Sequence, residues 1–171
     1  FMELFNKINE ICQNAREASL VLANTSGKVR NDLLLAMAKK IKEGYLDIIK
    51  ANEIDLKNAK ENGIKDAMLD RLMLDSGRIE KIAAAIREII ALDDPVGKTL
   101  SGTTRPNGLH ISKVSVPLGV IAVIYEARPN VTADAAALCL KSGNTVILRG
   151  GKEAINSNKA MAEVMRNAVA E

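Results

Sequence analysis

The sequence predicts an α/β fold in which a helical first half leads into a hairpin and then a parallel β–α–β unit. Three observations predict it. Apolar residues recur at helical spacing through most of residues 1–94. Two β-rich segments then flank a turn within residues 95–117. Residues 118–171 alternate apolar runs of strand length with helical patterns, which is typical of parallel strands joined by helices.

The helix boundaries of the first half follow from capping and breaking residues. Ser26 and Ser76 are good N-caps, because a serine oxygen can accept a hydrogen bond from a free N–H of the first helical turn. Gly44 can end the second helix, and Pro95 breaks the pattern of the fifth. The helices predicted on this basis cover residues 2–23, 28–43, 45–62, 66–74 and 78–92.

The second half changes to the period of β-structure. Arg105-Pro-Asn-Gly108 is a turn sequence between two β-rich segments, which predicts a hairpin with a half-solvated sheet. GVIAVIY is a continuous apolar run, as in a parallel strand buried on both faces. The strands predicted here cover residues 98–104, 109–116, 119–125 and 145–148, and the helices cover 132–141 and 153–170.

Composition excludes several classes of function. The net charge of +3 has its surplus in the second half, which suits a small anionic ligand and is too small for a nucleic-acid footprint. The longest apolar stretch contains Pro117 and is too short to span a bilayer. Cys12 and Cys139 lie in apolar helical patterns, which we interpret as inert, buried, reduced thiols in a cytoplasmic protein. One histidine, His110, leaves no zinc cluster and is expected on the surface.

Two segments carry a family resemblance. They are VPLGVIAVIYEARPNVT, residues 116–132, and LKSGNTVILRGGKEA, residues 140–154. They resemble the aldehyde dehydrogenase superfamily and, within it, the gamma-glutamyl phosphate reductases. The resemblance implies an aldehyde dehydrogenase-like cofactor-binding domain. Residues 1–94 would be its N-terminal helical cluster, residues 95–117 an oligomerisation hairpin, and residues 118–171 the start of its parallel sheet, truncated before the catalytic domain.

The resemblance also implies an activity. Members of this family reduce L-glutamyl 5-phosphate to L-glutamate 5-semialdehyde with NADPH and release phosphate, a step of proline biosynthesis. Their nucleophilic cysteine lies downstream of the segment seen here, so residues 1–171 alone are expected to be inactive. The hairpin implies a homo-oligomer. The alternative of another class is a non-catalytic nucleotide-binding or oligomerisation module, and a third possibility is a different acyl phosphate or aldehyde as substrate.

The resemblance assigns roles to individual residues. Asn130 matches the asparagine that donates its amide to the oxyanion of the tetrahedral intermediate; the alternative is a plain N-cap of the helix from Thr132. Arg149 matches a cofactor-ribose contact, and a guanidinium there would suit the 2′-phosphate of NADPH. Lys152 would assist it, unless the Gly150-Gly-Lys152 turn is purely steric.

The loop before Asn130 is expected to line the cofactor cleft. It consists of Ala127, Arg128 and Pro129. Glu126 and Arg128 could instead form a structural ion pair.

Overall fold

The structure, a computed structural model, describes residues 2–170. Helices alternate with two separate pairs of strands. The elements are α1 (Met2–Ala23), α2 (Gly27–Glu43), α3 (Tyr45–Glu61), α4 (Asp66–Leu72), α5 (Ser76–Ala91), β1 (Thr99–Thr104), β2 (His110–Val114), β3 (Val120–Ile124), α6 (Pro129–Lys141), β4 (Thr145–Arg149), the 3-10 helix η1 (Lys152–Ala154) and α7 (Ile155–Ala170).

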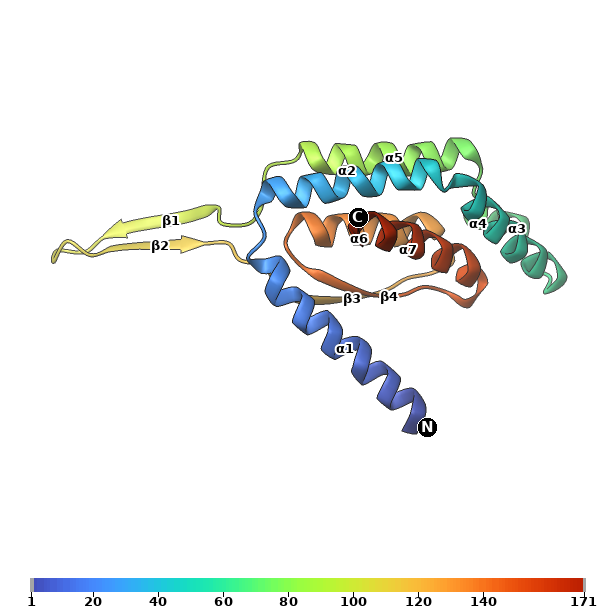
Figure 1. Cartoon of the computed structure of the whole chain (residues 1–171), viewed down its shortest axis with the longest axis horizontal. Coiled ribbons are helices and arrows are strands. Elements are labelled where there is room, and N and C mark those ends of the chain that lie inside the picture. The colour runs from blue at the N-terminus through green and yellow to red at the C-terminus, as the bar shows by residue number, and fades with distance from the viewer. Residues whose placement is uncertain (1, 171) are drawn as a thin grey trace.

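The helices form two layers over the β3–β4 pair. Figure 1 shows α2 beside α5 in an upper layer, α6 and α7 beneath them, and the two strands below, while α3 and α4 lie at one end. The core is aliphatic and comes mainly from α2, α5, α6 and α7. Its fully buried members include Leu34, Ala38, Ile41, Ile86, Ala133, Ala137 and Met161. The isoleucine-rich face of α5 therefore packs inward, as its helical spacing predicts.

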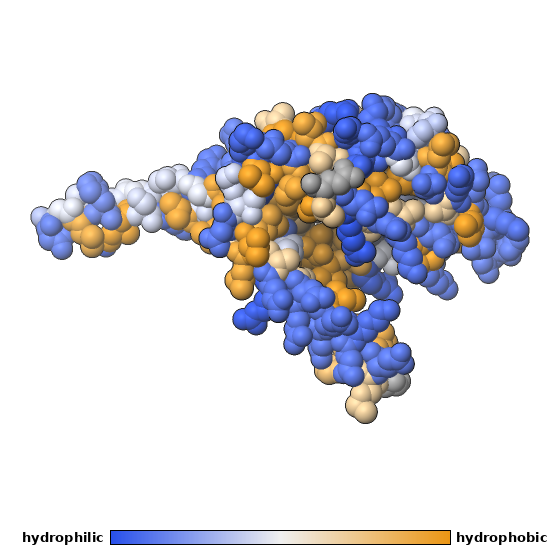
Figure 2. All heavy atoms as spheres, in the orientation of Figure 1, coloured by the Kyte–Doolittle hydropathy of each residue, from blue (hydrophilic) through white to orange (hydrophobic). Residues whose placement is uncertain are grey.

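Strands β3 and β4 pair in parallel, which confirms the predicted β–α–β unit. The expectation that β3 is buried on both faces is wrong: Val120 is 38% exposed and Ile124 is 75% exposed. A parallel strand is buried on both faces only where a layer covers each face. Here α1 reaches the pair near Ala15, whose carbonyl accepts from Thr145 Oγ1 at 2.9 Å. Figure 2 shows apolar atoms in the hollow between α1 and the helices above it.

The β1–β2 hairpin projects from the body (Figure 1). All residues of its strands are exposed, so the expected half-solvated sheet is wrong for the described chain, which places nothing against either face. The turn is as predicted, with Gly108 N–H donating to Arg105 O at 2.9 Å and φ +84° at Gly108. Ser115 fixes the base: its carbonyl accepts from Gly97 N–H at 2.9 Å, and its hydroxyl oxygen accepts from Lys98 N–H at 3.0 Å.

The capping predictions have mixed outcomes. Ser26 caps α2 by accepting from Val29 N–H at 3.3 Å, and Gly44 ends that helix, both as predicted. The predicted cap Ser76 is wrong, because the preceding Asp75 accepts from Arg78 N–H at 2.7 Å and caps α5. A carboxylate at that position also interacts favourably with the helix dipole.

Several helix boundaries differ from the prediction: α2, α3 and α5 by one or two residues, and the others as follows. Helix α4 ends at Leu72. Helix α6 begins at Pro129, three residues before the predicted Thr132, because proline is preset for the first helical position. The last predicted helix is divided into η1 and α7.

The two cysteines differ in environment. Cys139 is buried, as predicted. Cys12 is exposed, which corrects the expectation of a buried thiol, because α1 extends from the body and much of its surface faces solvent. Between residues 2 and 170, no helix combines the length and the hydropathy needed to cross a membrane.

Candidate functional site

The carboxyl ends of β3 and β4 bring two loops together. Parallel strands end at the same edge of their sheet, and the register places Ile124 opposite Arg149. Tyr125 N–H donates to Arg149 O at 3.1 Å, which extends the pairing by one residue. A Cβ on Gly151 would lie 3.2 Å from the backbone nitrogen of Ala127. The residues predicted to line the cofactor cleft and the predicted phosphate contacts therefore lie on adjacent loops.

Charge and burial are distributed unevenly along these loops. Ala127 and Pro129 are buried, whereas Arg128, Arg149 and Lys152 are exposed. Within residues 2–170 neither Arg149 nor Lys152 has a side-chain partner. The alternative ion pair does not form: Arg128 N–H donates to the backbone carbonyl of Glu126 at 2.8 Å, and the two side chains make no salt bridge in the described chain. The edge of the sheet thus presents unpaired cations.

A buried hydrogen-bond chain supports the first loop from below. The hydroxyls of Tyr125 and Thr132 lie 2.6 Å apart, and Thr132 Oγ1 donates to Asn158 Oδ1 at 2.9 Å. Asn158 Nδ2 is buried and has no hydrogen-bond partner among the described atoms. A Cβ on Gly150 would lie 2.2 Å from that nitrogen. Only glycine therefore fits at residue 150 without displacing Asn158.

These loops combine paired glycines with two exposed cations. The paired glycines let the two backbones approach closely, and Arg149 and Lys152 present free cations suited to a phosphate. Lys152 also lines a cavity of about 560 Å³ between α3 and η1, together with Asn58 and Asn62. Space and positive charge thus lie next to the loops where the cofactor is expected.

Asn130 lies on the first turn of α6, next to the strand-end loops. It follows Pro129 in the helix, so it is not the N-cap; that position belongs to Arg128, which makes no side-chain capping bond. Asn130 Nδ2 instead donates to Asp134 Oδ2 at 3.1 Å. The alternative of a capping role is therefore wrong, and the amide retains a second N–H.

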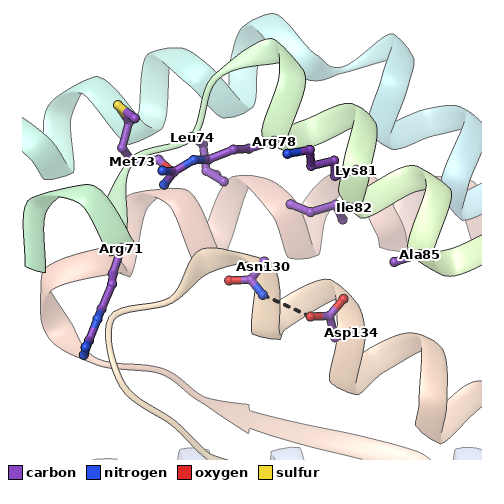
Figure 3. A pocket seen from close by; sticks show the side chains of 9 residues that line it. All are labelled: Arg71, Met73, Leu74, Arg78, Lys81, Ile82, Ala85, Asn130 and Asp134. Atoms are coloured by element: carbon purple, nitrogen blue, oxygen red, sulfur yellow. Dashed lines mark hydrogen bonds between the residues drawn. The ribbon is translucent and has the colours of Figure 1, made fainter. Parts of the chain in front are cut away.

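A cavity of about 250 Å³ opens above Asn130 and Asp134. Figure 3 shows these two side chains on α6 facing residues of α5, with Arg71 on α4 at the edge of the cavity and its guanidinium directed away from Asn130. Arg78 and Lys81 supply further cations from α5, and the remaining lining residues are Met73, Leu74, Ile82 and Ala85. Burial raises the pKa of the Asp134 carboxyl, an effect that the hydrogen bond from Asn130 partly opposes.

The cations of this cavity differ in how they are engaged. The Arg78 guanidinium donates to Met73 O at 3.0 Å and forms an ion pair with Asp70 at 2.6 Å. Arg71 and Lys81 have no hydrogen-bond or ion-pair partner in the described chain. No local sequence pattern singled out Arg71, Lys81 or Asp134 as site residues. The helical spacing of Asn130 and Asp134 was the one signal that could have linked a cavity residue to the predicted site.

The two cysteines stand apart from this geometry. Cys139 is 6% exposed on α6, and burial raises the pKa of its thiol, which disfavours the reactive thiolate. Its predicted inertness agrees with that environment. Cys12 lies on α1, and neither cysteine lines the cavity above Asn130.

Comparisons with known proteins agree with this architecture. A gamma-glutamyl phosphate reductase of Moorella thermoacetica is 54% identical over 156 residues, covering 91% of this chain and 37% of the relative. The relative of the same name from Xanthomonas campestris is 52% identical over 164 residues, covering 96% and 40%. The chain therefore spans about two fifths of the length of the curated relatives it matches.

Solved structures of relatives give the same picture. The crystal structure of gamma-glutamyl phosphate reductase from Thermotoga maritima aligns with a TM-score of 0.93 at 43% identity, covering 94% of this chain and 39% of that one. The Saccharomyces cerevisiae enzyme aligns with a TM-score of 0.89 at 38% identity, covering 94% and 41%. The model of the aldehyde dehydrogenase family matches residues 5–170. The chain therefore belongs to the aldehyde dehydrogenase family.

Proposed function

We propose that this chain is the N-terminal, cofactor-side part of an NADPH-dependent reductase that converts L-glutamyl 5-phosphate to L-glutamate 5-semialdehyde and phosphate. The names of relatives more than 50% identical support the substrate and the place in proline biosynthesis. The observation that carries the proposal is the adjacency of two features: the paired strand-end loops, and the Asn130 amide directly after them at the start of α6.

Residues of the strand-end loops would hold the cofactor. Arg149 is exposed and unpaired in the described chain, and its fork of donors matches a 2′-phosphate. Lys152 adds a second cation three residues later, while Ala127, Arg128 and Pro129 shape the neighbouring wall. When bound, NADPH supplies the hydride that reduces the acyl group to the aldehyde.

Asn130 would act at the reacting carbonyl. In the proposed reaction a thiolate from another part of the enzyme adds to the acyl carbon, and the carbonyl oxygen gains the negative charge. The oxyanion then collapses and the bond from carbon to the phosphate oxygen breaks. Phosphate departs, and the acyl group remains on the enzyme as a thioester. An N–H of Asn130 stabilises the oxyanion, an effect that is typically worth about 3 kcal/mol in the transition state.

The hairpin supports the expected homo-oligomer. Its strands expose Leu100, Ile111 and Val114, and both outer edges carry unpaired backbone groups. Exposed edges of this kind pair readily with a strand from another chain. We therefore assign residues 95–117 to contacts between subunits. A cytoplasmic location, expected from the reduced cysteines, completes the proposal.

A hybrid enzyme tests the function. Residues 2–170 replace the matching segment of the Moorella thermoacetica relative, and the assay follows NADPH formation from glutamate 5-semialdehyde, NADP⁺ and phosphate. We expect activity that depends on phosphate. Asn130→Ala is expected to lower kcat by about 100-fold with little change in KM. Asn167→Ala on the exposed surface of α7 is the matched control.

A folded hybrid without activity, next to an active parent enzyme, would contradict the proposal. That outcome would favour the alternative of a non-catalytic nucleotide-binding or oligomerisation module.

A further inference from the structure

We infer that the cavity above Asn130 is the subsite for the α-amino acid end of the substrate, with Asp134 binding its ammonium group and Lys81 and Arg71 binding its α-carboxylate. This inference rests on the proposed function, since that function defines which part of the ligand meets Asn130. It assigns roles to three residues that the sequence pattern did not single out.

The Asp134 carboxylate has no cationic partner in the described chain. It is half-buried, and its only polar contact in the described chain is the 3.1 Å hydrogen bond from Asn130. Placing a carboxylate away from water is unfavourable unless a cation or several donors compensate it. Arg78 does not compensate the Asp134 carboxylate, because its guanidinium is paired with Asp70. A ligand ammonium group would supply the missing positive charge.

Two cations that line this cavity are also unpaired in the described chain. Arg71 lines the same cavity as Asp134 from α4, and Lys81 lines it from α5; neither has a partner in the described chain. Opposite charges would normally approach one another, yet no ion pair links either side chain to Asp134. The cavity therefore keeps a negative site on α6 apart from positive sites on α4 and α5, as a zwitterionic ligand requires.

The spacing of Asn130 and Asp134 along α6 matches the length of a glutamyl chain. Residues four apart rise about 6 Å along a helix and lie on the same face. The reacting carbonyl carbon and the α-carbon of a glutamyl chain are three bonds apart, roughly 4 Å when extended, as are consecutive Cα atoms. The acyl oxygen and the ammonium nitrogen, which are bonded to these two carbons, can lie further apart than the carbons themselves. An acyl oxygen at Asn130 therefore places the ammonium group near Asp134.

Polarity distinguishes this cavity from a subsite for a simple aldehyde. An aliphatic or aromatic aldehyde would leave the two unpaired cations, Arg71 and Lys81, and the half-buried Asp134 carboxylate without a partner beside it. The hydrophobic lining residues Leu74, Ile82 and Ala85 suit the methylene groups of the chain between the two charged ends. The observations favour a short chain with a zwitterionic end.

Binding to the 171-residue chain tests the subsite without catalysis. Three probes are titrated and followed by amide resonances: L-glutamate, glutarate, which lacks the ammonium group, and 4-aminobutyrate, which lacks the α-carboxylate. We expect L-glutamate to shift the first turns of α6 and the start of α5, and to bind about tenfold more tightly than either analogue. Absence of these shifts, or equal binding of all three probes, would overturn the inference.

Two variants separate the charged partners. Asp134→Asn is nearly isosteric and is expected to lose the preference for L-glutamate over glutarate. Lys81→Gln is expected to lose the preference over 4-aminobutyrate. Glu88→Gln on α5 and Lys113→Gln on the hairpin are exposed controls that keep both preferences. A variant whose amide spectrum is native but whose preferences are unchanged would contradict the assigned role.

The two proposals can fail separately. In the hybrid enzyme, Asp134→Asn is expected to raise KM for glutamate 5-semialdehyde about tenfold with a smaller change in kcat. An active hybrid with an unchanged KM would disprove the subsite and leave the reductase function intact. Selective binding of L-glutamate, together with an inactive hybrid, would support the subsite and contradict the reductase function.

Discussion

Asp55 on α3 accepts two hydrogen bonds from Ser157 on α7, although the residues are 102 positions apart: one from its backbone N–H at 2.7 Å and one from its hydroxyl at 2.6 Å. The other carboxylate oxygen accepts from Asn156 Nδ2 at 2.7 Å and from its backbone N–H at 3.2 Å. One buried carboxylate thus satisfies two free N–H groups at the start of α7. That helix follows the second strand-end loop and η1 along the chain.

Asp55→Ala is expected to lower the free energy of unfolding by about 3 kcal/mol or more, because buried donors lose a charged acceptor. Chemical denaturation measures the difference. Asp47→Ala, an exposed aspartate on the same helix, is the control and is expected to change stability by less than about 1 kcal/mol. Equal effects at the two positions would show that the Asp55 contacts contribute little.

Asp94→Asn tests the link between α2 and the hairpin. The backbone N–H of Val96 and the buried Arg30 guanidinium, 2.7 Å away, hold the pKa of the Asp94 carboxyl below its ordinary value of 3.8. A lowered folded-state pKa stabilises the fold above pH 3.8, and this contribution is lost as pH falls through the folded value. The Asp94 side chain is 40% exposed, so solvent screens part of this interaction, and the variant is expected to be about 1 kcal/mol less stable at neutral pH. Thermal unfolding at several pH values should show the gap closing in acid.

Asp134→Asn is expected to show the opposite pH dependence. Burial raises the pKa of Asp134 above 3.8 in the folded chain, so its ionisation opposes folding. Stability attributable to this residue is full below pH 3.8 and falls as pH rises through the folded value. The variant should therefore unfold at a higher temperature than the wild type at neutral pH, with the difference vanishing in acid. A variant less stable at every pH would mean that the Asn130 contact outweighs desolvation.

Arg149→Gln tests the proposed phosphate contact. The probes are 2′-phospho-AMP and AMP, which differ by the phosphate that distinguishes NADPH from NADH. We expect binding of the phosphorylated probe to the variant to weaken about tenfold, with little change for AMP. Arg105→Gln at the hairpin turn removes the same charge elsewhere and is expected to leave both affinities unchanged. Calorimetric titration measures the affinities for both probes. Equal losses of affinity for the two probes would indicate that Arg149 does not contact the 2′-phosphate.

Local signals in the sequence predicted the order of elements. Helical spacing, the glycine at residue 44 and the turn Arg105–Gly108 each act over a few neighbours, and all of them hold in the structure. Errors arose where two local choices competed. Asp75 and Ser76 are both good caps, and the structure uses the aspartate. The proline at residue 129 begins a helix that the pattern placed at residue 132.

Most of the site depends on contacts that a local pattern does not contain. The sequence does predict that the two strand-end loops are neighbours, because parallel strands end at the same edge of their sheet. Nothing near Arg71 or Lys81 in the sequence relates them to Asn130, since tertiary packing brings residues of α4, α5 and α6 around one cavity. The exposed Cys12 is a similar case: its helix has an apolar pattern, but the tertiary arrangement leaves it facing solvent.

The hairpin also has a mechanical consequence. A six-residue strand is about 20 Å long, and β1 is held at its base by the hydrogen bonds of Ser115 with Gly97 and Lys98. Such a projection acts as a lever. A change of a few degrees in the direction of the backbone at Ser115 becomes a displacement of ångströms at Asn107. The base of the hairpin therefore sets the spacing and angle at which its tip can meet another surface.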